Sequence, residues 1–357
     1  MYPAVAVLQA LGKHSHTVLW VGSEDGMEAR LVSRTGTRFE GISAAGVHGV
    51  GLTALPGNLW RLLRGYFAAH RILKQFKPDV LFFTGGYVAV PMALAGFRKP
   101  ILLYVPDIEP GLALKVLARF ADCIGLTVDQ SGAFFPSKTR MVTTGYPLRE
   151  EFTRWQRPEA VQTLGLENGL PTLLVFGGSK GARSINRAIL AVLPDLLKIA
   201  QVIHISGQLD WAEVENARSG LTADLAARYH AYPYLYDEMG AAMAAADLVV
   251  SRAGASTLGE FPHYGLPAVL IPYPYAWRYQ KVNAEHLCSQ GAAVMLEDQN
   301  LGAQLFSTIQ NLLNDTNKLE SMRHAMRGLA RPQAANHLAE LLQELAAPSA
   351  QKLGVAS

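Results

Sequence analysis

The stretch PTLLVFGGSKGARSINRAILAVL, residues 171–193, decides the fold because three local signals follow one another in it. TLLVF is a short apolar run of the kind that is buried in a parallel sheet. Three glycines then permit a tight turn, and INRAILAVL has the apolar spacing of a helix. A strand that passes through a glycine-rich turn into a helix is half of a βαβ unit, so the stretch predicts a doubly wound α/β domain.

The same alternation of strand and helix extends in both directions from this stretch. The other strand-like runs are residues 16–22, 79–86, 100–106, 122–128, 140–145, 201–207, 247–254 and 267–274. A polar passage at 154–171 interrupts the pattern, so we expect a domain boundary near Arg149 to Pro158. The prediction is an α/β chain of two Rossmann-like domains facing across a cleft. Their bounds are 1–148 and 149–330, followed at 331–357 by a helix and tail that could return to the first domain.

Composition excludes several classes of protein. The chain has 357 residues, of which 50% are apolar and 17% charged, as in a globular protein. It has two cysteines, which cannot form a disulfide framework, and its net charge of +3 is too small to indicate nucleic acid. It contains no Asp-x-Asp pair and no cluster with metal-ligand spacing, so we expect neither a metal nor another cofactor.

Glycine-rich turns are the strongest sign of chemistry. They occur at 83–96, 175–186 and 251–260, each between a predicted strand and a predicted helix. Such turns present backbone N–H groups and a helix N-terminus, which together favour phosphate. None has the spacing of a Walker loop. We expect Arg149 and Arg252 to supply positive charge, with Lys180 and Arg183 as weaker candidates.

The segment at 60–77, WRLLRGYFAAHRILKQFK, predicts an unusual helix. No acidic residue lies between Glu40 and Asp79, and the helix carries more apolar groups than one buried face needs. It is either an ordinary packed helix with solvated charges or a helix that lies on an anionic membrane. The residues predicted to contact the membrane are Trp60, Arg61, Arg64, Phe67, Arg71 and Lys74.

An ordered series of motifs resembles the two-domain glycosyltransferases of the MurG type. The series is TGGYVAVP, PGLALKVLARFAD, GYPLR, FGGSKGAR, ADLVVSRAGASTLGE, GLPAVLIP and QKVNA. The resemblance implies transfer of N-acetylglucosamine from its UDP donor to a polyprenyl-diphosphate-linked muramyl-pentapeptide. It also implies a peripheral protein at the cytoplasmic side of the cell membrane, which takes part in peptidoglycan synthesis.

The resemblance assigns roles by position. Arg149 and Ser179 correspond to contacts with the donor nucleotide and phosphates, and Tyr236 stands where a backbone group reads the uracil. Ala255, Ser256, Thr257, Leu258, Gly259 and Glu260 resemble the diphosphate and ribose loop, with Glu260 on the ribose. Gln280 and Asn283 match the residues that read the sugar hydroxyls. The turn of Thr84, Gly85, Gly86 and Tyr87 is assigned to the acceptor side.

Two departures from the family pattern bear on the acceptor side. Family members begin with a strand and a GGTGGH loop, whereas this sequence begins at MYPA with a predicted helix. Loss of a central strand would leave an apolar slot in the first sheet, so we expect a longer N-terminus in the working protein. The chain also reads YVPDIEPG, residues 104–111, where the family usually has HEQN before PG.

The expected reaction is an inverting, metal-independent displacement in which Asp107, at the second departure, serves as the general base. Two alternatives stay open. One is an enzyme of the same fold that acts on another lipid acceptor such as diacylglycerol. The other is an inactive homologue that only binds a nucleotide-sugar.

Overall fold

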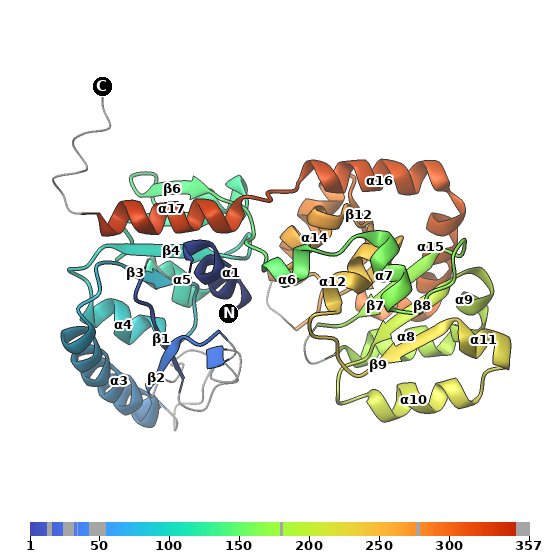
Figure 1. The fold of residues 1–357 in the computed structure, drawn as a ribbon, viewed down its shortest axis with the longest axis horizontal. Helices are drawn as coiled ribbons and strands as arrows, with labels where there is room; N and C mark the ends of the chain where they lie inside the picture. The colour runs from blue at the N-terminus through green and yellow to red at the C-terminus, as the bar shows by residue number, and fades with distance from the viewer. Residues whose placement is uncertain are drawn as a thin grey trace. The chain divides into compact units, whose positions relative to one another are not determined.

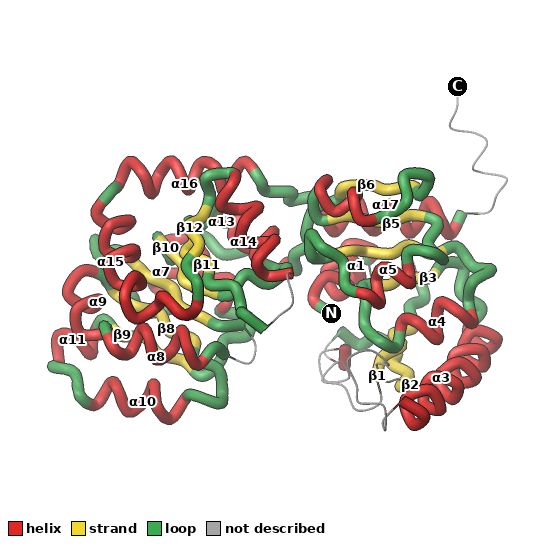
Figure 2. Tube along the Cα trace, turned by 180° about the vertical axis from the view of Figure 1, so that it is seen from behind, coloured by secondary structure: helices red, strands yellow, loops and turns green. Residues whose placement is uncertain are grey.

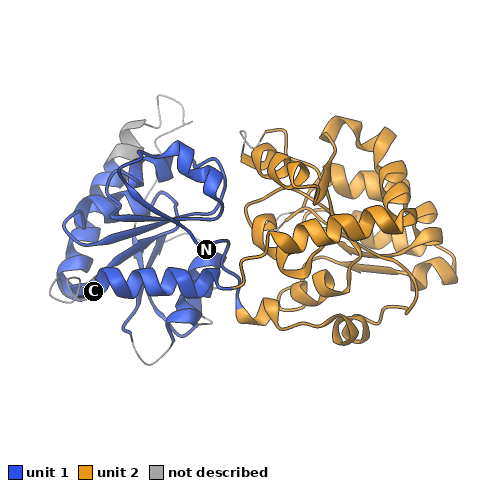
Figure 3. Cartoon of the chain, turned by 90° about the horizontal axis from the view of Figure 1, so that it is seen from above, with its two compact units in different colours: residues 1–149, 333–357 blue, residues 150–332 orange. Residues whose placement is uncertain are grey.

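The computed structural model describes residues 1–12, 16–23, 32–33, 35–42, 55–178, 181–275 and 279–347, except for the side chains of 55–59 and 61. The chain divides into two compact units (Figure 3). Unit 1 comprises Met1–Arg149 and Gln333–Ser357, and unit 2 comprises Glu150–Pro332. The described part of each unit is an α/β structure (Figure 2).

Unit 1 alternates strands and helices along most of its length (Figure 1). Its strands are β1 (Leu19–Ser23), β2 (Arg38–Ile42), β3 (Leu81–Phe83), β4 (Ile101–Val105), β5 (Cys123–Leu126) and β6 (Arg140–Thr143). Its helices are α1 (Tyr2–Leu11), α3 (Leu55–Phe76), α4 (Ala89–Ala95), α5 (Leu112–Leu117), the 3₁₀ helix η2 (Asp129–Phe134) and α17 (Ala334–Ala346).

The strands of unit 1 form two parallel sheets. β1 pairs with β2, and the other four strands pair in the order β3-β4-β5-β6. A cavity of about 1210 Å³ is lined by residues of β1, β3, α1 and α17. Among the described residues, β1–β2 and β3–β6 are two separate sheets.

The last helix, α17, is part of unit 1 although it follows unit 2 in the sequence. It lies beside α1 and β4 (Figure 1). Leu338 and Leu342 of α17 pack with Val7 of α1 and with Leu102 and Tyr104 of β4 in one buried cluster. α1 and α17, which are far apart in the sequence, therefore share one hydrophobic core.

Unit 2 has a longer run of alternating elements. Its strands are β7 (Thr172–Phe176), β8 (Gln201–Ile205), β9 (Tyr229–Tyr232), β10 (Leu248–Ser251), β11 (Ala268–Leu270) and β12 (Ala293–Met295). Its helices are α6 (Glu150–Thr153), α7 (Arg157–Thr163), α8 (Arg183–Ala191), α9 (Leu193–Ile199), α10 (Trp211–Ser219), α11 (Ala223–Ala227), α12 (Met239–Ala245), α13 (Thr257–Tyr264), α14 (Tyr279–Ser289), η3 (Asp298–Asn300), α15 (Leu301–Asn314) and α16 (Thr316–Gly328).

The six strands described in unit 2 make one parallel sheet in the order β12-β11-β10-β7-β8-β9. Starting from β7, the chain adds β8 and β9 on one side and then β10 to β12 on the other. β7 and β10 are therefore the neighbours at which the order reverses. In doubly wound sheets, ligands bind at the carboxyl ends of the strands at this switch point.

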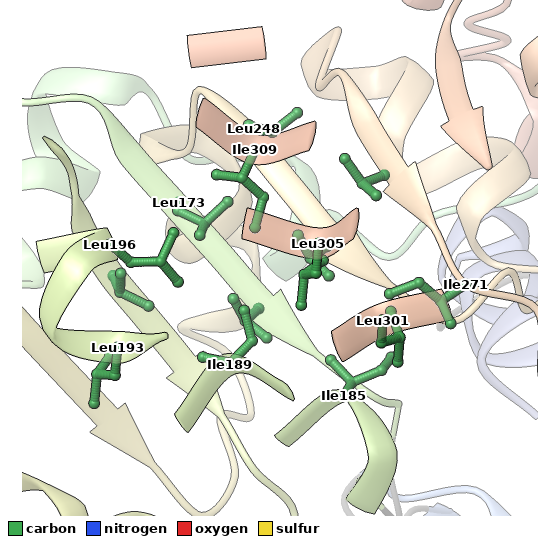
Figure 4. Close-up of a cluster of buried hydrophobic side chains, with 14 of the residues drawn as sticks. Leu173, Ile185, Ile189, Leu193, Leu196, Leu248, Ile271, Leu301, Leu305 and Ile309 are labelled. Atoms are coloured by element: carbon green, nitrogen blue, oxygen red, sulfur yellow. The ribbon is translucent and has the colours of Figure 1, made fainter. Parts of the chain in front are cut away.

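The core of unit 2 explains why the opening stretch folds as predicted. Figure 4 shows Leu173 of β7 and Leu248 of β10 among side chains from α8, α9 and α15. Ile185 and Ile189, four residues apart on α8, lie in the same buried cluster. All five residues of β7 are buried, as the apolar run predicted.

Three strands were missing from the sequence prediction. β2 reads RFEGI and β9 reads YHAY, so neither is a continuous apolar run. β12 reads AVM and has three residues, which is too short for periodicity to identify. Each pairs with one neighbouring strand, so sheet pairing rather than local pattern defines it.

Candidate functional site

The turn between β7 and α8 is closely packed and built on glycine. Gly178 and Gly181 have φ values of 93° and 79°, a conformation that favours glycine. A Cβ on Gly181 would lie 2.2 Å from the carbonyl oxygen of Ser206, and one on Gly177 would lie 2.3 Å from the backbone nitrogen of Ala182. Ser179 and Lys180 lie outside the described residues, so the role expected for Ser179 stays a prediction.

A network of buried polar side chains lies next to this turn. Asn186 of α8 donates to the carbonyl of Ser206 at 2.9 Å and to Asp210 at 2.9 Å. The buried ring of His204 lies 3.0 Å from Asn186 and 2.8 Å from the hydroxyl of Tyr229. Burial lowers the pKa of His204 to about 4, so the ring is neutral at pH 7.

Arg183 also belongs to this network, because it contacts Asp210. Its Nε donates to Asp210 at 2.9 Å. Its side chain is 61% exposed, and the role expected for Arg183 toward phosphate stays a prediction.

The second glycine turn lies after β10, the strand next to β7. The turn leads into α13, which begins without a side-chain cap. Thr257 donates its hydroxyl to the carbonyl of Gly254 at 2.7 Å. Of the loop residues expected to hold the diphosphate and ribose, Thr257, Leu258 and Gly259 are buried, whereas Ala255, Ser256 and Glu260 are partly exposed.

Arg252 is held at the start of this turn by several groups. Its Nη1 donates to Asp298 and to the carbonyl of Ile271 at 3.1 Å, and its Nη2 donates to Ser184 at 2.7 Å. Ser184 itself donates to Asp298 at 2.8 Å. The Arg252 side chain is 10% exposed. We call Arg252, Ser184 and Asp298 the switch-point triad; the sequence analysis identified only its arginine.

Two residues of α14 contact the loops that follow β10 and β11. Asn283 is fully buried and donates to the carbonyl of Ala253 at 3.1 Å. Gln280 accepts from the N–H of Tyr273 at 2.9 Å. Asn283 therefore fixes the backbone of the second glycine turn, whatever contact it makes with a sugar.

Tyr236 and Arg149 lie apart from the two glycine turns in the sequence. Tyr236 follows β9, is 56% exposed and packs edge-on against Tyr234 with ring centroids 4.6 Å apart. Arg149 is the last residue of the first segment of unit 1, and its guanidinium lies 4.4 Å from the centre of the Tyr2 ring. The roles predicted for both residues remain predictions.

In unit 1, the acceptor-side turn follows β3 and lines the cavity described above. Thr84, Gly85, Gly86 and Tyr87 all contribute to its wall. Gly85 and Gly86 have φ values of 105° and 88°, which again favour glycine.

The departure at YVPDIEPG affects mainly the core of unit 1. Tyr104 and Val105 are fully buried, and the Tyr104 hydroxyl pairs with Thr127 at 2.6 Å. Two of the four departed positions therefore lie inside the core of unit 1. Burial raises the pKa of Tyr104, and the charge of Asp107 raises it further. Asp107 itself is half-buried, two residues beyond the end of β4.

α3 presents one exposed stripe of apolar and basic side chains. Its opposite face, with Gly65, Ala69 and Ile72, is buried. The spacing i, i+3, i+4, i+7, i+11 and i+14 places the stripe on one side of the helix. The stripe residues are Trp60, Leu63, Arg64, Phe67, Arg71 and Lys74, all of them exposed. The side chain of Arg61, also predicted to contact a membrane, lies outside the described residues.

Further exposed apolar side chains lie on and beside the neighbouring helices. The sequence analysis did not identify these side chains. α4 packs against both α3 and α5. Leu94 of α4, Phe97 after it, and Leu112 and Val116 of α5 are 40% to 59% exposed. Arg98 lies beside them, 5.4 Å from the centre of the Phe97 ring. Their signal in the sequence was weak because each helix is short.

No group of three or more His, Cys, Asp or Glu side chains in the described ranges could hold a metal ion. None of the described helices has the length and apolar character needed to cross a membrane.

Curated relatives match the chain over nearly its whole length. One from Roseiflexus sp. (strain RS-1) is 39% identical, with 97% of this chain and 92% of the relative covered. Another, from Halothermothrix orenii, is 37% identical over 97% of this chain and 96% of the relative. Both are named UDP-N-acetylglucosamine–N-acetylmuramyl-(pentapeptide) pyrophosphoryl-undecaprenol N-acetylglucosamine transferase.

Solved structures agree with the fold. The crystal structure of MurG from Acinetobacter baumannii is 28% identical and has a TM-score of 0.74, with 96% of this chain and 95% of that chain covered. The calicheamicin glycosyltransferase CalG4 has a TM-score of 0.67 at 15% identity, which supports the fold alone.

Two family models match successive parts of the chain. The glycosyltransferase family 28 N-terminal domain matches residues 1–126, and its C-terminal domain matches residues 172–341. The two-domain α/β fold, the glycine turns at the switch point and these matches lead to one conclusion: the chain belongs to glycosyltransferase family 28.

Proposed function

We propose that this protein transfers N-acetylglucosamine from UDP-N-acetylglucosamine to a muramyl-pentapeptide linked through diphosphate to a polyprenol. The observation that carries the proposal is the identity of 39% to a transferase named for this reaction, over 97% of the chain. The two glycine turns at the β7–β10 switch point support it, because such turns suit a diphosphate.

The donor would bind to unit 2 with its diphosphate at these turns. The N-termini of α8 and α13 follow the turns, and each carries about half a positive charge. Charge that develops on the departing UDP would be stabilised there without a divalent ion. Arg149 remains the candidate side-chain cation, and Gln280 the candidate reader of the sugar hydroxyls.

The acceptor would bind to unit 1, where the turn of Thr84 to Tyr87 lines the cavity. Its hydroxyl would attack the anomeric carbon and displace UDP with inversion. Asp107, half-buried beyond the end of β4, would accept the proton of that hydroxyl. An Asp107→Asn variant should lose at least about 100-fold in turnover while it binds UDP as the parent does. Full turnover in this variant would exclude Asp107 as the base.

The exposed stripe of α3 would hold the protein on an anionic membrane, where a polyprenol-linked acceptor resides. Trp60, Leu63 and Phe67 would enter the interface, and Arg64, Arg71 and Lys74 would meet lipid phosphates. The exposed apolar groups of α4 and α5 would widen this surface. The location that follows is the cytoplasmic side of the cell membrane, with peripheral attachment.

Radiolabelled sugar transfer to defined acceptors tests the function. The full chain is given UDP-N-acetylglucosamine with either the lipid-linked muramyl-pentapeptide or diacylglycerol. We expect label in the muramyl-pentapeptide product alone. Transfer to diacylglycerol instead would replace the proposed acceptor, and nucleotide binding without transfer to either would indicate an inactive homologue.

A further inference from the structure

The switch-point triad connects three segments that are distant in the sequence. Arg252 begins the turn after β10, Ser184 lies in the first turn of α8, and Asp298 begins η3 after β12. Every pair within the triad is joined by a hydrogen bond or ion pair. The triad therefore ties the two glycine turns to each other at the place where the strand order reverses.

The guanidinium of Arg252 is largely used by the protein itself. Nη1 lies within hydrogen-bonding distance of the carbonyls of Ile271 and Pro272 as well as of Asp298. The side chain is 10% exposed, and the ring centre of Tyr273 lies 5.3 Å from the guanidinium carbon. Asp298 also neutralises its charge locally. These contacts are typical of an arginine that holds backbone carbonyls in place rather than of one that binds an anion.

We infer that the switch-point triad is a positioning device for the donor site: it sets the spacing of the two glycine turns, and Arg252 acts through them rather than by contact with the diphosphate. The inference rests on the proposed binding of the donor diphosphate at these turns. It adds two residues, Ser184 and Asp298, to the donor site and changes the role expected for Arg252.

The effect of Asp298→Asn on UDP binding distinguishes this positioning role from a purely electrostatic effect. Asp298→Asn removes a negative charge next to the proposed phosphate site, so electrostatics alone predicts tighter UDP binding. Loss of the triad predicts weaker binding, because the turns are no longer held at a fixed spacing. Glu297→Gln is the matched control, since it removes the same charge from the adjacent, exposed residue outside the triad.

Calorimetric titration of the full chain with UDP measures this difference. We expect Asp298→Asn to weaken binding by about tenfold or more and Glu297→Gln to leave it unchanged. Ser184→Ala should also weaken it, and Ser184→Thr, which keeps the hydroxyl, should restore it. Asp298→Asn that binds UDP as well as the parent, or better, would overturn the inference.

A second measurement without ligand separates this inference from the proposed function. Hydrogen exchange of peptides covering 175–186 and 250–258 reports on the two turns in the free protein. We expect Asp298→Asn to speed exchange in both peptides and Glu297→Gln to change neither. Unaltered exchange in Asp298→Asn would overturn the triad's role, whereas a parent protein that binds no UDP would overturn only the proposed donor site.

Discussion

At the scale of single residues, Gly181 is the position where the backbone most clearly excludes a side chain. Gly181→Ala would place a Cβ 2.2 Å from the carbonyl oxygen of Ser206 at a φ of 79°. Gly178→Ala has a similar φ of 93° but meets no atom within 4 Å, so it is the matched control for strain alone. We expect Gly178→Ala to cost about 1 to 2 kcal/mol of stability and Gly181→Ala to cost more. Thermal unfolding compares them, and equal losses would show that the contact with Ser206 is easily relieved.

His204 gives the stability of the protein a predictable dependence on pH. Burial lowers the pKa of His204 from 6.5 to about 4, so the folded state disfavours the charged ring. The contribution of the neutral ring to the free energy of unfolding is therefore fully present above pH 6.5. It is lost as the pH falls toward 4. The loss amounts to at most about 3 kcal/mol.

The comparison of the parent with His204→Gln isolates this contribution. Denaturant unfolding between pH 7 and pH 4 should show a smaller fall in stability for the variant, because the glutamine does not titrate. Parallel falls in the two proteins would show that His204 contributes nothing to the pH dependence.

At the scale of elements, the exposed stripe of α3 predicts membrane binding that depends on both apolar and basic groups. Phe67 is 70% exposed, and Phe67→Ser should reduce partition into vesicles of anionic phospholipid by about tenfold. Leu209→Ser is the control, because Leu209 is 78% exposed but belongs to unit 2. Co-sedimentation with vesicles measures both. Binding that ignores salt, anionic lipid content and Phe67 would contradict the proposed attachment.

Elements with strong local patterns could be predicted from the sequence, and those defined by their neighbours could not. The apolar run of β7, the glycine turn and the spacing of α8 occur in one short stretch, so each signal supports the others. The exposed residues of α3 were predicted in part because apolar and basic residues recur at helical spacing within 60–77. β9 and β12 were missed because pairing with β8 and β11, respectively, is what makes them strands.

The same distinction applies within the candidate site. Glycine turns are visible in the sequence because only glycine suits their backbone. The bonds of Arg252 with Asp298 and Ser184 span 46 and 68 residues, and no local pattern records such a contact. Sequence reasoning therefore found the turns and Arg252 but did not find its partners Ser184 and Asp298.

At the scale of the whole molecule, each unit has its own sheet arrangement and its own buried clusters. Unit 2 carries a doubly wound sheet whose order reverses between β7 and β10. Unit 1 carries the turn of Thr84 to Tyr87, Asp107 and the stripe of α3. Under the proposed function, the donor would bind to unit 2 and the lipid-linked acceptor to unit 1, so the binding of each ligand can be tested without the other.

We propose that main-chain amides and helix N-termini at the β7–β10 switch point hold the donor's diphosphate without a divalent ion. Calorimetric titration of the full chain with UDP-N-acetylglucosamine, in chelator and then in magnesium or manganese, tests it most directly. We predict the same affinity in all three conditions. Binding that occurs only with added metal, or no binding at all, would contradict the account.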